Sequence, residues 1–286
     1  MNTLAIDIGG TKLTLGLFEN ETLIERNSRA TDRSGGPAWM LQQIEEMATQ
    51  WLSRFSIQRC GIGFGGPVDF AAQRVVCSTH VAGWDDFDLV GAIRERLGLA
   101  AVIDRDTMAG ALGEGYYGAG IGARPLFYMT ISTGIGGGLL THEGLYHGVD
   151  SFSCEIGHHI VQPDGPECLC GARGCLERLC SGLWLERDYG KPASELLRDP
   201  TFVAQYVRPL ALGIKNCIMF LNPARIVIGG GIGKAGDALF TPLRLELHRQ
   251  ITPWSRARVD VVPAKLGDDS ILWGALALSQ NLHRAA

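Results

Sequence analysis

The stretch TLAIDIGGTKLTLGLFENETLIER, residues 3–26, predicts how the chain begins to fold. TLAIDI is an apolar run, KLTLGLF alternates along its length, and the Glu-Asn pair before ETLIER is typical of a turn. We therefore expect three consecutive strands at the start of the chain.

Helical and strand patterns alternate along the rest of the sequence. Residues 36–54 carry apolar side chains at spacings of three and four, which predicts a helix, and residues 100–104 form a short apolar run that predicts a buried strand. A second set of strands begins near residue 124, and SILWGALALSQNL from residue 270 predicts a final helix. Because strands alternate with helices twice over, we expect two α/β domains with a cleft between them.

Composition narrows the class of protein. The chain has 286 residues, of which 46% are hydrophobic and 20% charged, and a net charge of −4. This charge provides no long-range attraction to nucleic acid or to anionic lipid, and no apolar stretch approaches the roughly 20 residues of a membrane span. The first residues lack the features of a signal peptide. We expect a cytoplasmic protein with small-molecule partners and reduced cysteines.

Three cysteines lie within eight residues in PECLCGARGCLE, residues 166–177. Cys168, Cys170 and Cys175 follow the pattern C-x-C-x4-C, whereas a redox dithiol usually has C-x-x-C. A tetrahedral zinc site needs a fourth ligand, and His158 and His159 lie a few residues upstream. A structural Cys3His zinc site is the leading interpretation, and a glycine-rich loop with three chance cysteines is the alternative.

Three glycine-rich stretches follow or link predicted strands. They are DIGGTK (7–12), STGIGGG (132–138) and IGGGIGKAG (228–236). Glycine allows backbone N–H groups to approach an anion closely. None of the three matches the P-loop or the dinucleotide-binding fingerprint, so we expect a nucleotide held between two lobes.

The first of these stretches has side chains suited to a nucleotide. Asp7 ends a predicted strand and could hold Mg²⁺ through water, while Thr11 and Lys12 offer a hydroxyl and a cation to phosphate. The alternative is a tight hairpin with a surface lysine.

Six motifs in one order resemble the ROK family of repressors, open reading frames and sugar kinases. They are DIGGTK, GIGFGGPVD, DTMAGALGE, STGIGGG, EIGHH followed by CLCGARGCLE, and LNPARIVIGGG. The resemblance implies a two-lobed, actin-like ATPase fold of mixed sheets flanked by helices, with sugar and ATP meeting in the cleft. It implies a small lobe of residues 1–107, a large lobe of 108–269 with a zinc loop at 155–177, and a final helix, 270–284, that returns to the small lobe.

The resemblance also assigns roles on the sugar side. Asp106 matches the catalytic base, which accepts the proton of a sugar hydroxyl as that oxygen attacks the γ-phosphate of ATP. Glu155, His158 and Glu177 match residues that hold sugar hydroxyls, and Gly66 lies in the matching GIGFGGPVD turn. His158 also matches the fourth zinc ligand, with one ring nitrogen on the metal and the other facing the sugar.

On the nucleotide side the resemblance covers three loops. The matching residues are Asp7, Gly9, Gly10, Thr11 and Lys12 in the first phosphate loop, Thr133 and Gly134 in the second, and Gly229, Gly230 and Gly231 beneath the adenosine.

Two positions depart from the family pattern. Arg105 and His80 stand where the family usually has asparagine. Arg105 could pair with Asp104 or Asp85, or it could read an anionic group or an unusual hydroxyl pattern on the substrate. Next to Asp106, it could also lower the pKa of the base.

These observations lead to functions of different classes. The first is an ATP-dependent kinase acting on a hydroxyl, O6, of a hexose or N-acetylhexosamine, in the manner of glucokinases and N-acetylmannosamine kinases. The others are a catalytically silent sugar sensor and a sugar-responsive repressor, although DIGGTK begins at residue 7 and leaves no room for a preceding DNA-binding motif. We expect a homodimer, since symmetric dimers are the commonest oligomers.

Overall fold

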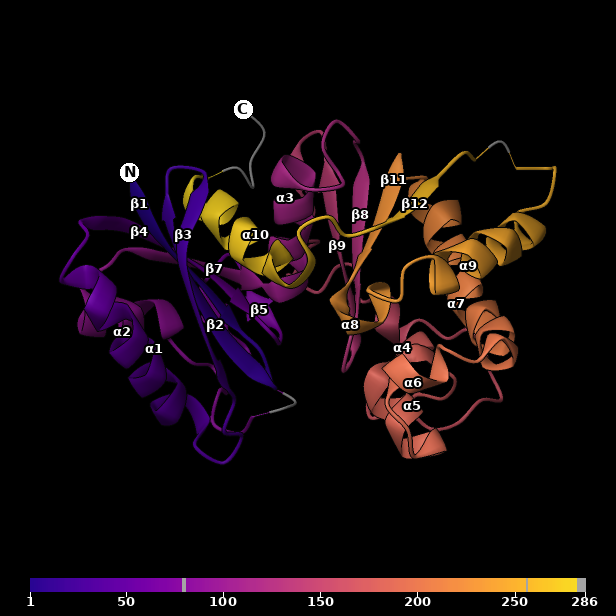
Figure 1. The fold of residues 1–286 in the computed structure, drawn as a ribbon, viewed down its shortest axis with the longest axis horizontal. Coiled ribbons are helices and arrows are strands. Elements are labelled where there is room, and N and C mark those ends of the chain that lie inside the picture. Colours follow the sequence, from indigo (N-terminus) through magenta and orange to yellow (C-terminus); the bar gives the residue numbers. More distant parts are fainter. Residues whose placement is uncertain (79–80, 256, 282–286) are drawn as a thin grey trace.

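The computed structural model describes residues 1–78, 81–255 and 257–281, and it contains two five-stranded sheets flanked by helices (Figure 1). The first sheet has the order β3-β2-β1-β4-β7. Its strands are β1 (Asn2–Ile8), β2 (Lys12–Glu19), β3 (Thr22–Ala30), β4 (Ile57–Phe64) and β7 (Ala101–Arg105). A short hairpin, β5 (Val68–Asp69) with β6 (Arg74–Val75), lies beside it.

The second sheet repeats this topology with the order β10-β9-β8-β11-β12. Its strands are β8 (Leu126–Ile131), β9 (Ile135–Thr141), β10 (Gly144–Leu145), β11 (Arg225–Gly229) and β12 (Asp260–Pro263). In both sheets three strands form an antiparallel meander, and two further strands run parallel to its first strand. The mixed α/β fold class predicted from the sequence is confirmed.

The three strands predicted for the start of the chain are confirmed as β1, β2 and β3. The β1–β2 connection is tight, with the Gly9 N–H donating to the Lys12 carbonyl at 2.9 Å. The predicted turn before β3 is also present, with Asn20 at φ 52°. Asn tolerates this left-handed conformation better than most residues, which explains its place in the turn.

Helices cover the outer face of each sheet (Figure 1). They are α1 (Gly36–Leu52) and α2 (Leu89–Leu97) on the first sheet, and α7 (Pro200–Leu221) and α9 (Asp237–Gln250) on the second. The periodicity that predicted α1 is confirmed, because Met40, Ile44, Met47 and Trp51 are all buried on one face. No helix in the described part of the chain combines the length and apolar character that a membrane span requires.

Two helices, α3 (Asp106–Tyr117) and α10 (Ser270–Ser279), form a layer between the sheets (Figure 1). Leu272 and Ala275 of α10 pack with Ala5 of the first sheet, whereas its Ala277 and Leu278 pack in a cluster with residues of the second sheet. The two helices approach so closely that a Cβ on Gly274 would lie 1.7 Å from the Ala109 carbonyl oxygen. The lobe boundary at residue 107 stays a prediction.

Buried Glu114 on α3 holds the chain that leads into α10. Its carboxylate accepts hydrogen bonds from the backbone N–H groups of Ala119 (2.7 Å), Lys265 (3.1 Å) and Leu266 (2.9 Å), and from the Ser270 hydroxyl (2.7 Å). The side chain is fully buried, so these four donors replace its hydration. The segment between β12 and α10 is fixed to α3 in this way.

The remaining helical turns surround these layers. They are α4 (Leu176–Cys180), α5 (Gly182–Tyr189), α6 (Ala193–Leu196), α8 (Gly230–Gly233) and the 3-10 turns η1 (Ile156–His158) and η2 (Gly267–Asp269).

Candidate active site

A cavity of about 540 Å³ lies between the two sheets, and residues from both sheets line it. Its walls include residues that follow the carboxyl ends of β1, β4, β7, β8 and β11, which is where open α/β sheets bind ligands. The predicted site residues found in its lining are Asp7, Gly9, Gly10, Thr11, Lys12, Gly66, Arg105, Asp106, Thr133, Gly134, Glu155, His158, Glu177, Gly230 and Gly231. Predicted contact residue His80 lies outside the described residues.

The first glycine turn brings Asp7 to the cavity, where the carboxyl group is almost completely buried. Burial, followed by the nearby Asp106 carboxylate, raises the pKa of Asp7 to about 8, and Lys12 opposes this shift. Two carboxylates facing one cavity repel each other, and a divalent cation would relieve that repulsion. Asp7 therefore fits the predicted role in holding Mg²⁺.

The start of α5 holds the second glycine turn, at residues 132–138, through backbone hydrogen bonds. The carbonyl groups of Ser132 and Thr133 accept hydrogen bonds from the N–H groups of Gly182 (2.7 Å) and Leu183 (3.2 Å). Glu177 holds the other end of the turn, since its Oε2 accepts a hydrogen bond from the Ile135 N–H at 2.8 Å. Backbone groups of this turn are thus fixed at the cavity wall before any ligand arrives.

The third glycine turn contributes only in part. Gly230, at φ 81°, and Gly231 line the cavity, whereas Gly229 does not. Gly229 lies behind the wall, where a Cβ would come within 2.4 Å of the Tyr128 hydroxyl oxygen. Its lack of a side chain makes room for Tyr128, which itself lines the cavity.

Asp106 is the first residue of α3, and its Oδ1 accepts a hydrogen bond from the Thr107 N–H at 2.7 Å. Burial raises the pKa of Asp106 to about 6, although that hydrogen bond and Arg105 both lower it. The predicted lowering of the Asp106 pKa by Arg105 is confirmed as one contribution, but desolvation outweighs it and the net shift is upward. A carboxyl group with this pKa is mostly ionised at neutral pH and can still accept a proton.

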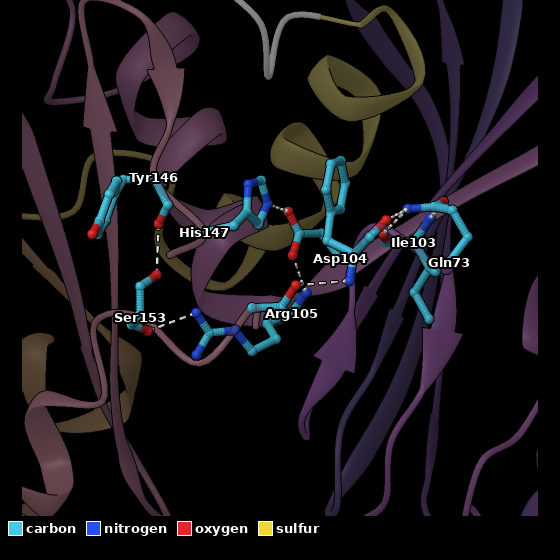
Figure 2. Close-up of polar contacts among 9 residues, drawn as sticks. Gln73, Ile103, Asp104, Arg105, Tyr146, His147 and Ser153 are labelled. Atoms are coloured by element: carbon cyan, nitrogen blue, oxygen red, sulfur yellow. Dashed lines mark hydrogen bonds and ion pairs between the residues drawn. The ribbon is translucent and has the colours of Figure 1, made fainter. Parts of the chain in front are cut away.

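The predicted pairing of the Arg105 side chain with Asp104 or Asp85 is wrong. The Arg105 guanidinium donates one hydrogen bond to Glu155. It donates another, of 2.7 Å, to the Ser153 carbonyl (Figure 2). Successive residues of a strand point to opposite faces, so the Arg105 side chain leaves the face that Asp104 occupies. Asp104 accepts a hydrogen bond from the Arg105 backbone N–H instead, at 2.8 Å.

The cysteine cluster comes together as predicted. Ligand atoms of His158, Cys168, Cys170 and Cys175 all lie within 4.8 Å of one another. The Sγ atoms of Cys170 and Cys175 are 3.6 Å apart, and Cys168 Sγ is 4.0 Å from His158 Nδ1. A tetrahedron with zinc–sulfur bonds of about 2.3 Å requires sulfur–sulfur separations of about 3.8 Å, so the group fits a zinc ion.

His159 lies outside this cluster. Its Nε2 is 2.7 Å from Asn216 Nδ2 on α7, so the ring is engaged away from the three thiols. His158, in contrast, belongs both to the cysteine cluster and to the cavity lining.

Comparison of the sequence with known proteins identifies the family of this chain. The profile of the ROK family matches residues 3–281. The chain belongs to the ROK family. It is 30% identical to a glucokinase of Thermotoga maritima, with 97% of each chain covered, and 31% identical to an N-acetylmannosamine kinase of Vibrio cholerae, with 96% of this chain and 98% of the relative covered.

A solved structure extends the match to three dimensions. A ROK family glucokinase from Streptomyces griseus, in complex with glucose and AMPPNP, superimposes with a TM-score of 0.87 and 26% identity over 98% of this chain and all of that one. The actin-like two-sheet architecture expected from the family resemblance is thereby confirmed.

The sequence of this ROK family member did not lead us to predict several residues that line the cavity. Arg33, Tyr128, Thr130, Asp268 and Ser270 also line the cavity. Thr130 could have been inferred, because it is the penultimate residue of β8, just before the second glycine turn. Arg33 and Asp268 stand in connecting segments without a motif, and only the folded chain brings them to the site.

Proposed function

We propose that this chain, a carbohydrate kinase by its family and its relatives, transfers the γ-phosphate of ATP to O6 of a hexose or N-acetylhexosamine. The observation that carries the proposal is Asp106. It is a half-buried carboxyl group whose pKa is raised by desolvation to about 6, and it lines the same cavity as two glycine turns and a group of polar side chains.

In the proposed reaction Asp106 accepts the proton of the sugar hydroxyl. The hydroxyl oxygen forms a bond to the γ-phosphorus as the bond from that phosphorus to the β–γ bridging oxygen breaks, and ADP leaves with the electron pair. Phosphoryl transfer depends mainly on alignment and charge neutralisation. Asp106 is well suited to this task because the start of α3 holds its carboxylate in place.

The phosphates are proposed to lie against the turns of residues 9–12 and 132–134. Their backbone N–H groups and the Lys12 ammonium would bind the phosphate oxygens, while Gly230 and Gly231 line the adjoining wall. Asp7 would hold Mg²⁺, and the ion would neutralise phosphate charge during transfer.

The sugar is proposed to lie against Glu155, Glu177 and His158. Each presents a group that can hydrogen-bond to a hydroxyl. The charge of Arg105 is already paired with Glu155, and Glu177 and Asp106 add negative charge to the same cavity. Neutral sugars are therefore the favoured substrates, ahead of sugar acids.

A structural zinc ion is proposed at His158, Cys168, Cys170 and Cys175. The ion would fix the orientation of the His158 ring through Nδ1, which leaves Nε2 for the cavity. With four protein ligands it would have no open position, so its role would be structural.

The proposal is tested by a coupled assay of ADP release with Mg-ATP and a panel of neutral hexoses, N-acetylhexosamines and sugar acids. Asp106→Asn should reduce kcat by about 10²–10⁴-fold. Asp237→Asn, at an exposed position at the start of α9, serves as the matched control. Turnover of sugar acids alone would contradict the preference for neutral sugars. Sugar binding without turnover of any panel member would replace the kinase with a sugar sensor.

A further inference from the structure

Residues 146–155, hereafter the 146–155 segment, reach from the second sheet to residues of the first (Figure 2). The segment follows β10 and ends at Glu155. Its Ser151 hydroxyl accepts a hydrogen bond from the Phe70 N–H at 3.1 Å, and its His147 ring stacks on the Phe70 ring with centroids 4.0 Å apart and planes 9° apart. Phe70 directly follows β5, so these contacts join the two halves of the molecule.

His147 also contacts the end of β7. Its Nε2–H donates to Asp104 Oδ2 at 2.8 Å, and Asp104 Oδ1 accepts from the Arg105 backbone N–H at 2.8 Å (Figure 2). The Asp104 side chain is 1% exposed, so it depends on these donors for its hydrogen bonds. Asp104 therefore links His147 to the backbone of the residue that precedes Asp106.

The side chain of Arg105 completes the connection. It donates to the Ser153 carbonyl at 2.7 Å and to Glu155, while its buried Nε has no hydrogen-bond partner among the described residues. Within the segment, the Ser153 hydroxyl donates to the Tyr146 carbonyl at 2.6 Å and the Ser153 N–H donates to the His147 carbonyl at 3.3 Å. The segment is thus closed on itself between Tyr146 and Ser153.

We propose that His147 is a positioning residue that sets the placement of Glu155 relative to Asp106, an inference that rests on the proposed function. In the proposed function Glu155 stands on the sugar side and Asp106 is the base. Asp106 directly follows β7 of the first sheet, whereas Glu155 ends the segment that follows β10 of the second sheet. Without His147, the buried Asp104 carboxylate loses a donor and the 146–155 segment loses its ring contact with Phe70. Because a displacement of about 1 Å can reduce turnover by about 10²-fold, this contact bears directly on catalysis.

Kinetics of three variants test the role. His147→Leu removes the donor at similar size, and His147→Gln restores an N–H close to the position of Nε2. His142→Leu alters an exposed histidine on the neighbouring β9–β10 turn and is the matched control. We expect His147→Leu to lower kcat/KM for the sugar by about 10–100-fold with the KM for ATP within about twofold, and His147→Gln to recover most of the loss. Equal losses of kcat/KM in the Leu and Gln variants would overturn the proposal. So would a KM for ATP that changes by more than about twofold in His147→Leu.

Hydrogen exchange measured by mass spectrometry tests the same contact independently of turnover. In His147→Leu, exchange should rise both in the 146–155 segment and at residues 104–107, while residues 57–64 of β4 keep the exchange of the parent protein. Unchanged exchange at residues 104–107 would refute the link even in a protein that phosphorylates no sugar. An inactive parent protein that still shows the coupled rise would refute the proposed function and leave the link in place.

Discussion

Replacement of Glu114 tests how much the connection between α3 and the chain before α10 contributes to stability. Each carboxylate oxygen accepts two hydrogen bonds, Oε1 from Leu266 and Ser270 and Oε2 from Ala119 and Lys265. Glu114→Ala removes both oxygens and leaves three partly buried backbone N–H groups and one buried hydroxyl without this acceptor. Glu114→Gln keeps one oxygen as an acceptor. It replaces the other oxygen with an NH2 group, which faces two hydrogen-bond donors.

The magnitude follows from the number of groups left unpaired. A buried donor that loses its partner costs about 1–3 kcal/mol, and such losses within one network are not additive. We expect Glu114→Ala to reduce the free energy of unfolding by about 3–5 kcal/mol and Glu114→Gln by about half as much. At about 2 °C per kcal/mol for a chain of this length, the Tm of the alanine variant should fall by roughly 6–10 °C.

Differential scanning calorimetry measures this difference, with Glu143→Ala as the control because Glu143 is exposed. The control should stay within about 0.5 kcal/mol of the parent protein. Gly267, Asp268 and Ser270 line the cavity and follow the segment that Glu114 holds, so the KM for ATP should also rise in the alanine variant. A Tm within about 2 °C of the parent value for Glu114→Ala would refute the reasoning.

Three further outcomes are expected. Since Asp106 must be ionised to accept a proton and its pKa is about 6, kcat/KM should fall about tenfold per pH unit below pH 6, and a profile flat to pH 5 would contradict this role. Burial raises the folded-state pKa of Asp7 from 3.8 to about 8, so the folded protein retains a proton that the unfolded chain releases between those values. Stability of the ligand-free protein should therefore decrease as pH rises across this window, and Asp7→Asn, measured by Tm at pH 5 and pH 8, should remove the decrease. Treatment with a chelator, or Cys170→Ser, should lower Tm and reduce the metal content below the expected one zinc per chain. The control variant Cys180→Ser changes a cysteine outside the cluster and should retain one zinc per chain.

Local patterns in the sequence predicted the fold wherever a single periodicity dominated. The buried face of α1 followed from the spacing of Met40, Ile44, Met47 and Trp51. The helix α9 was not predicted, although Leu239, Leu243 and Leu247 recur every four residues, and Pro242 within it weakens the pattern. The short helices of residues 176–196 are too brief for a periodicity to be visible.

The candidate site was predictable in its residues and less so in its contacts. The resemblance to the ROK family pointed to Asp106, Glu155 and His158, and all three line the cavity. The partner of Arg105 was not predictable, because Glu155 is far from it in sequence and only the crossing of the 146–155 segment brings them together. The sign of the pKa shift of Asp106 depended on burial, which a charged neighbour in the sequence does not reveal.

The placement of α10 against β1 has a consequence for how the protein is made. Ala5 and Phe18 of the first sheet are covered by residues 272–276 of α10. A ribosome adds about 5–20 residues per second. This face of the newly synthesised sheet therefore stays uncovered for on the order of tens of seconds, until α10 has been synthesised. During synthesis the N-terminal sheet therefore exposes an apolar face to the cell, and slow translation late in the message should increase its capture by chaperones.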